Sequence, residues 1–139
     1  PLRRQRQMCI RDSYKYNFFS LAAPNALAYE LFVELKNLIP NDGKWMQSWI
    51  NYHYPDQVLK WHNHDWDYHG YISIVPHDTT TRFADYSIIN EVGNIYIGPG
   101  HRQHEVIVNE KFESPRITIG FDVTTHMAPP NNMLSLIPL

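Results

Sequence analysis

Apolar residues recur every three or four positions in one early part of the chain. Between residues 24 and 39 they are Leu27, Leu31, Leu35 and Leu38, with Phe32 and Ile39 beside them. This spacing places them on one face of an α-helix. Pro24 and Asn25 are typical of a helix start, and the Pro-Asn-Asp-Gly run at 40–43 is typical of a helix end. We therefore predict an amphipathic helix over residues 24–39 that packs outside a sheet.

The pattern elsewhere favours strands. A first strand is predicted over residues 14–21, ahead of the helix. Seven further short strands are predicted over residues 45–54, 58–62, 70–75, 83–88, 94–98, 105–108 and 116–123. Turn residues such as Gly98-Pro99-Gly100 separate them. Many short strands with one helix predict a mainly β fold, an antiparallel sandwich or barrel of the jelly-roll kind. The stretch 124–139 either adds an edge strand or covers the core.

Length and composition predict one globular domain over residues 14–139. The chain has 139 residues, of which 43% are hydrophobic, and single domains cluster near this size. Residues 1–13 lack helical and strand periodicity, and the run Met8 to Ser13 resembles translated sequencing-adaptor sequence. We expect residues 1–13 to be a disordered or non-native leader.

Charge and cysteine content exclude several classes. From residue 16 onward there are seven basic and thirteen acidic residues, which argues against a nucleic-acid-binding surface. No window approaches eighteen consecutive apolar residues, so no membrane span is predicted. The single Cys9 excludes an internal disulfide or a zinc–thiolate site and favours a reducing compartment. The protein is expected to be soluble and cytoplasmic, and a homo-oligomer is left open.

The segment 61–71 concentrates residues that bind metals. It contains His62, His64 and His69 together with Asp65 and Asp67. On an extended chain, residues two apart point to the same side, so His62 and His64 can direct two imidazoles at one point. A third ligand must come from elsewhere, and His104 is the best candidate because it follows a Gly-Pro-Gly turn and begins an alternating strand.

The last predicted strand carries a candidate anion site. Arg116, Thr118 and Gly120 share one face of this strand, whereas Ile117, Ile119 and Phe121 share the other. A guanidinium matches a carboxylate through two parallel hydrogen bonds. Arg116 and Thr118 together therefore predict a carboxylate-binding position.

Several ordered motifs between residues 44 and 123 resemble the putative iron(II)/2-oxoglutarate oxygenases, which have a double-stranded β-helix fold. They are Trp49-Ile50-Asn51, Trp61 to His64, Gly70 to Pro76, Gly98 to His104 and Arg116 to Asp122. The resemblance implies iron(II) and 2-oxoglutarate as cofactors, dioxygen and an unknown substrate as partners, His62 and His104 as metal ligands, and Arg116 as the 2-oxoglutarate anchor. The chain departs from the family at residue 64, where His replaces Asp or Glu.

This departure leaves two alternatives for the metal ligand from this motif. Either His64 replaces the carboxylate, or Asp65 or Asp67 turns inward. We favour His64, since its strand parity matches that of His62. Asn51 is expected beside the cofactor or a ligand imidazole, and Asp67 could orient an imidazole. The remaining histidines are interpreted as surface residues or as residues behind the ligands; they are His53, His69, His77, His101 and His126.

Two other functions compete with the oxygenase. A cupin is a jelly-roll protein that binds metal without 2-oxoglutarate, and His62 and His64 match its first histidine pair. The glutamate that a cupin carries four or five residues after His64 is absent, because Tyr68 and His69 stand there. A noncatalytic sandwich with a structural histidine cluster is the other alternative. Arg116 with Thr118 favours the oxygenase, because a cupin needs no carboxylate anchor at that place.

Overall fold

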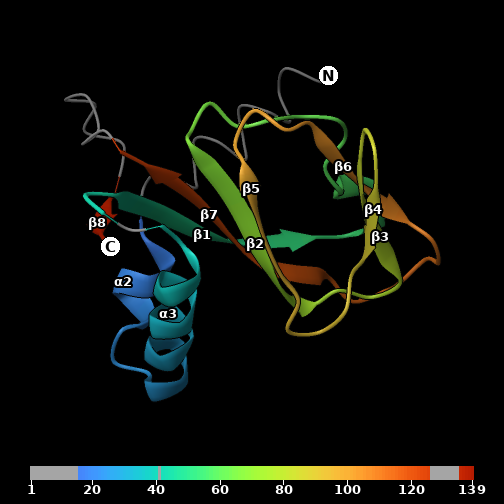
Figure 1. The fold of residues 1–139 in the computed structure, drawn as a ribbon. Helices are drawn as coiled ribbons and strands as arrows, with labels where there is room; N and C mark the ends of the chain where they lie inside the picture. Colours follow the sequence, from blue (N-terminus) through green and yellow to red (C-terminus); the bar gives the residue numbers. More distant parts are fainter. Residues whose placement is uncertain (1–15, 41, 126–134) are drawn as a thin grey trace. The chain divides into compact units, whose positions relative to one another are not determined.

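The protein is mainly β in a computed structural model that describes residues 16–40, 42–125 and 135–139 (Figure 1). Its helices are α2 (Phe18–Ala22), α3 (Ala26–Leu38) and a short 3₁₀ helix, η1 (Pro55–Gln57). Its strands in the described residues are β1 (Trp45–His53), β2 (Tyr68–Val75), β3 (Thr79–Phe83), β4 (Ser87–Ile89), β5 (Ile95–Pro99), β6 (His104–Val108), β7 (Arg116–Thr124) and β8 (Ile137–Pro138). No helix in these ranges is long and apolar enough to cross a bilayer.

The strands form two sheets. One has the order β5-β2-β7-β1-β8 and the other β4-β3-β6. The pairings with a defined register are antiparallel: β2 with β5, β3 with β4 and β6, and β1 with β8. The larger sheet places strands side by side that are distant in the sequence, such as β2 with β7 and β7 with β1. The predicted fold class, a double-stranded β-helix with an N-terminal helix, is confirmed.

The chain divides into two compact units. One comprises residues 50–122, and the other comprises the described parts of 1–49 and 123–139, so β1 and β7 contribute to both. The prediction of a single domain over 14–139 stays a prediction. The predicted leader, residues 1–13, and His126 lie outside the described residues.

The strand predicted over residues 14–21 is wrong, because α2 begins at Phe18. Asn17 caps α2 instead, because its side-chain oxygen accepts a hydrogen bond from the backbone N–H of Ser20 at 3.3 Å. The Asn17 amide also donates to the Met46 carbonyl at 2.9 Å. A capping side chain favours a helix over an extended chain. The helix predicted over residues 24–39 is confirmed as α3, with Asn25 as its N-cap.

Two other strand predictions change, and one alternative is resolved. Residues 58–62 are not a strand: η1 precedes them, and only His62 forms a bridge. The segment 83–88 turns back on itself, because the Phe83 N–H donates to the Tyr86 carbonyl at 2.8 Å, so β3 ends there and β4 begins at Ser87. In the C-terminal stretch, Ile137 pairs with Met46 and adds an edge strand.

Strand β7 is buried along nearly its whole length although it carries polar side chains. Arg116, Thr118 and Asp122 are 4%, 1% and 3% exposed. Alternation places all three on one face of the strand. Because buried polar and charged groups are costly unless they are satisfied, this face of β7 marks the interior position where a polar site is expected.

Candidate metal and anion site

A backbone bridge brings two of the predicted ligands together. The His62 N–H donates to the His104 carbonyl at 3.0 Å, and the His104 N–H donates to the His62 carbonyl at 2.9 Å. This reciprocal pair joins the segment before β2 to the first residue of β6. The two imidazole rings consequently lie 4.3 Å apart between centroids.

The loop that carries His64 is held against the turn that precedes His104. The His64 N–H donates to the Gly100 carbonyl at 2.9 Å, and the Gly100 N–H donates to the Asp67 carbonyl at 3.1 Å. A side chain at position 100 would collide with the carbonyl of Trp66. A glycine is therefore required for this close approach of two backbones.

The three predicted metal ligands form one cluster. Each of His62, His64 and His104 offers a nitrogen, and these nitrogens lie within 4.8 Å of one another. Around a bound metal the nitrogens would lie roughly 3 to 4 Å from one another, because each lies about 2.1 Å from the ion. Asp65 and Asp67 are exposed and join neither of the clusters that the described residues form.

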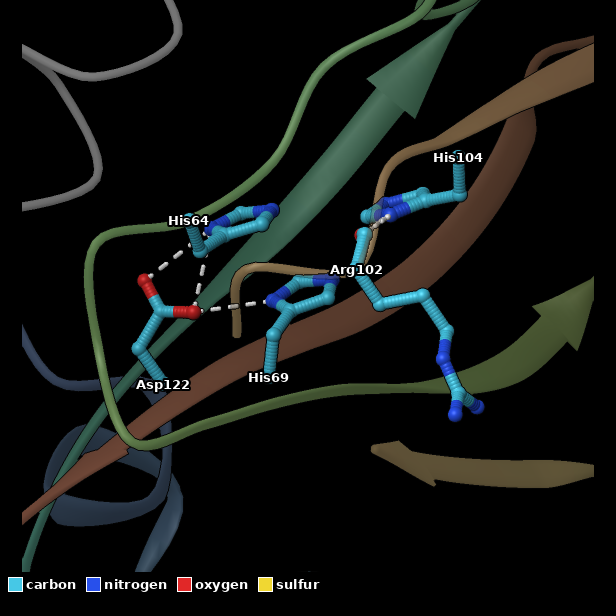
Figure 2. A network of polar contacts seen from close by, with 5 residues as sticks. All are labelled: His64, His69, Arg102, His104 and Asp122. Carbon is cyan, nitrogen blue, oxygen red and sulfur yellow. Dashed lines mark hydrogen bonds and ion pairs between the residues drawn. The ribbon is translucent and has the colours of Figure 1, made fainter. Parts of the chain in front are cut away.

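Two residues that were not predicted as ligands, His69 and Asp122, also belong to the site. His69 is the second residue of β2 and is buried, and its ring stacks on that of His64 with centroids 3.5 Å apart. Asp122 from β7 contacts both imidazoles, through His64 Nδ1 at 3.1 Å and His69 Nδ1 at 2.8 Å. Figure 2 shows the carboxylate on one side of the two rings, with their other nitrogens directed away from it, toward the side where His104 lies.

All four imidazoles have Nδ1 beside an oxygen acceptor. His62 Nδ1 lies 2.7 Å from the Lys60 carbonyl and His104 Nδ1 lies 3.2 Å from the Arg102 carbonyl, while His64 and His69 face Asp122. A carbonyl or an ionised carboxylate can only accept, so Nδ1 carries the proton in each ring. Each neutral ring then presents the lone pair of Nε2, the nitrogen that a metal needs.

Burial shifts the pKa of two histidines in this cluster. Burial, reinforced by the neighbouring histidines, lowers the pKa of His104 to about 2. Burial also lowers the pKa of His69. Burial alone would raise the pKa of Asp122, but hydrogen bonds from His64 and His69 hold it below its ordinary value. At neutral pH the site therefore combines the neutral imidazoles of His69 and His104 with one ionised carboxylate.

The predicted anion site occupies the opposite end of β7 from Asp122. The Asn51 amide donates to the Thr118 hydroxyl at 3.1 Å. Arg116 is buried, its Nε has no hydrogen-bond partner in the described part of the chain, and no carboxylate there forms an ion pair with it. Its charge lowers the pKa of His53 after the larger effect of burial, and burial lowers the pKa of Arg116 itself to about 10.

The structure brings His62, His64 and His104 into one cluster and, separately, Asn51 into contact with Thr118. Of the histidines interpreted as surface residues or as residues behind the ligands, His53 and His69 are buried, whereas His101 is exposed and His77 is half-buried. Asp122 was missed because its role depends on which strands are neighbours. One signal was available, since Asp122 shares strand parity with Arg116 and Thr118.

The sequence matches no protein-family model and no curated protein. Among solved structures, the fold is similar to an oxidoreductase of the 2OG-Fe(II) oxygenase family from Burkholderia pseudomallei, with a TM-score of 0.54 and 12% identity over 83% of this chain and 60% of that one. A cupin protein from Bacteroides fragilis matches with a TM-score of 0.46 and 12% identity, over 76% of this chain and 86% of that one. A cupin-2 domain protein from Shewanella frigidimarina matches with a TM-score of 0.41 and 14% identity, over 66% and 90%. At such identities the likeness shows the fold alone.

Proposed function

We propose that this protein is an iron(II)- and 2-oxoglutarate-dependent oxygenase in which His62, His64 and His104 hold the metal. Their donor chemistry fits a divalent transition metal, because each ring has Nδ1 beside an oxygen acceptor, which leaves Nε2 for the metal. Imidazoles suit iron, copper, nickel and zinc alike. The choice of iron with a 2-oxo acid therefore depends on the second half of the site.

The buried Arg116 is the observation that carries this proposal. A buried cation without a counter-ion is costly, and a carboxylate ligand would offset that cost. 2-Oxoglutarate has two suitable ends, since its 2-oxo acid end can bind the metal and its other carboxylate can pair with the guanidinium. A ligand of this kind uses the metal cluster and Arg116 together.

Thr118 and Asn51 complete the proposed anchor. The Thr118 hydroxyl accepts a hydrogen bond from the Asn51 amide at 3.1 Å. Its own proton is then available for another acceptor, because a hydroxyl donates once and accepts twice. We assign Thr118 a hydrogen bond to the same carboxylate that Arg116 neutralises, and Asn51 the task of holding the hydroxyl.

The chain and its cofactors divide the chemistry between them. When bound, iron(II) and 2-oxoglutarate supply oxidation by dioxygen. The chain binds the metal through the imidazole Nε2 atoms, and it anchors the far carboxylate of the cosubstrate. The identity of the substrate is left open by this arrangement.

The direct test is calorimetry of 2-oxoglutarate binding, with manganese(II) in place of iron(II). Wild type should bind 2-oxoglutarate only when the metal is present. Arg116→Gln should weaken that binding at least tenfold and leave manganese binding within twofold, because Arg116 contacts the ligand and not the metal. If metal-loaded wild type bound no 2-oxoglutarate, or if the variant bound it equally well, the oxygenase proposal would be abandoned.

His69 favours a second candidate, a cupin-type metal protein that works without 2-oxoglutarate. His69 lies five residues after His64, where a cupin carries a glutamate, and its ring centroid is 5.1 Å from that of His104. Four imidazoles on an octahedral metal leave two positions, too few for a chelating 2-oxo acid and dioxygen together. His69→Ala separates the candidates: it should leave metal affinity within twofold if three imidazoles bind, and lower it at least tenfold if four do.

A further inference from the structure

One carboxylate from β7 connects two imidazoles that come from different parts of the chain. His64 lies in the loop between η1 and β2, whereas His69 lies in β2 itself. Asp122 Oδ1 is 2.8 Å from His69 Nδ1 and 3.1 Å from His64 Nδ1, and Asp122 Oδ2 is 3.3 Å from His64 Nδ1. Asp122 and His69 are almost fully buried, so little water can replace these contacts.

We propose that Asp122 is a positioning residue that holds His64 and His69 with Nδ1 protonated, so that both rings turn Nε2 toward His62 and His104. This inference rests on the metal cluster, which both candidate functions share, and not on 2-oxoglutarate. A single carboxylate then fixes the loop ligand and the strand imidazole in the same orientation, which the near-parallel rings, 8° apart, reflect.

The chemistry of a carboxylate is specifically required at this position. An ionised carboxylate is an acceptor at both oxygens, whereas an amide presents N–H groups at one of its two positions. With Asn at position 122, the amide nitrogen would take the place of Oδ1 or Oδ2. His64 Nδ1 is close to both, so in either orientation an N–H of the amide would face it. The expected result is that His64 moves its proton to Nε2 and loses the lone pair that binds metal.

The test uses nitrogen NMR of the protein labelled with ¹⁵N-histidine, because this spectrum reports which ring nitrogen carries the proton. In metal-free wild type, His64 and His69 should both carry it on Nδ1. In Asp122→Asn, His64 should carry it on Nε2, and the affinity for zinc or cobalt(II) should fall about 10- to 100-fold, as for other residues that orient a ligand.

Glu105→Gln is the matched control. Glu105 is also a buried carboxylate of the same unit, but its partner is Arg82. This variant should leave both the histidine protonation pattern and the metal affinity unchanged. Because the wild-type spectrum is informative by itself, the test does not depend on whether Asp122→Asn folds.

Two results would overturn the role of Asp122. One is a wild-type spectrum with the proton on Nε2 of either ring, which would make Asp122 part of a separate metal site with the two Nδ1 atoms. The other is a folded Asp122→Asn with unchanged proton positions and metal affinity. Failure to bind 2-oxoglutarate would end the oxygenase proposal and leave these measurements unaffected, so the two failures are distinguishable.

Discussion

Replacement of Arg116 by Met should stabilise the ligand-free protein while it removes the proposed anion site. Arg116 is 4% exposed and its pKa is lowered to about 10 by burial, against an ordinary value of about 12.5. One pKa unit corresponds to about 1.4 kcal/mol, so the buried charge costs about 3 kcal/mol at neutral pH. Met is unbranched and flexible and carries no charge, so we expect a gain of up to about 3 kcal/mol in unfolding free energy.

The cost of the buried Arg116 charge should also change with pH. Since the pKa is lower in the folded state, the unfolded chain binds more protons between about pH 10 and pH 12.5. The cost is therefore fully present below pH 10 and is relieved as the pH rises through that window. The gain from Arg116→Met over wild type should accordingly be constant near neutrality. The pKa of His53 should also rise in the variant, because the charge of Arg116 contributes to lowering it.

Urea unfolding of metal-free protein at pH 7, followed by circular dichroism, measures the free-energy change. Arg82→Met is the matched control, because Arg82 pairs with the buried Glu105 and its removal should destabilise the fold. A loss of stability in Arg116→Met similar to that in Arg82→Met would refute the reasoning. It would mean that the Arg116 charge is already compensated within the chain.

Three further predictions concern acid stability, backbone packing and the metal ligands. Burial lowers the pKa of His53 to about 4, below about 6.5 in the unfolded chain, so metal-free protein should lose about 3 kcal/mol of unfolding free energy through this group as the pH falls from about 6.5 to 4. In urea unfolding at pH 7 and pH 4, His53→Phe should lose less stability than wild type, and an equal loss in both proteins would contradict the prediction. Gly100→Ala should lower zinc affinity at least tenfold in a chelator competition, because a Cβ would meet the Trp66 carbonyl. Gly93 has a φ of 85° and open space around it, so the control variant Gly93→Ala should cost about 1 kcal/mol of stability and leave zinc affinity unchanged. His62→Ala and His104→Ala should each reduce the iron content of anaerobically loaded protein to below a tenth of the wild-type value, and equal iron in all three would remove the site.

The sequence predicts local elements well where side-chain pattern and backbone chemistry agree. The helix over 24–39 follows from its leucine spacing and from Asn25 as its cap. The strand predicted from Tyr14 fails because Asn17 binds the backbone of the next turn. The strand predicted from Phe83 fails because a tight turn interrupts an apolar run, and an apolar run by itself does not reveal where the chain reverses.

The site can be predicted only in part from the sequence, because some of its residues meet only through the pairing of distant strands. His62 and His64 lie two residues apart, so their common direction follows from strand geometry. Asp122 lies 58 residues from His64, and only the placement of β7 beside β2 in the sheet brings it to the imidazoles. The role of His69 likewise depends on Asp122. Residues that orient ligands through long-range contacts require the fold to be known.

Succinate release from 2-oxoglutarate, with iron(II) and ascorbate and without added substrate, tests the central claim most directly. The proposed oxygenase should form succinate slowly, because turnover uncoupled from substrate needs only the metal cluster, the Arg116 anchor and dioxygen. His104→Ala and Arg116→Gln should abolish this release for different reasons, the first through loss of the metal and the second through loss of the cosubstrate. Succinate from wild type no greater than that from His104→Ala would contradict the assignment.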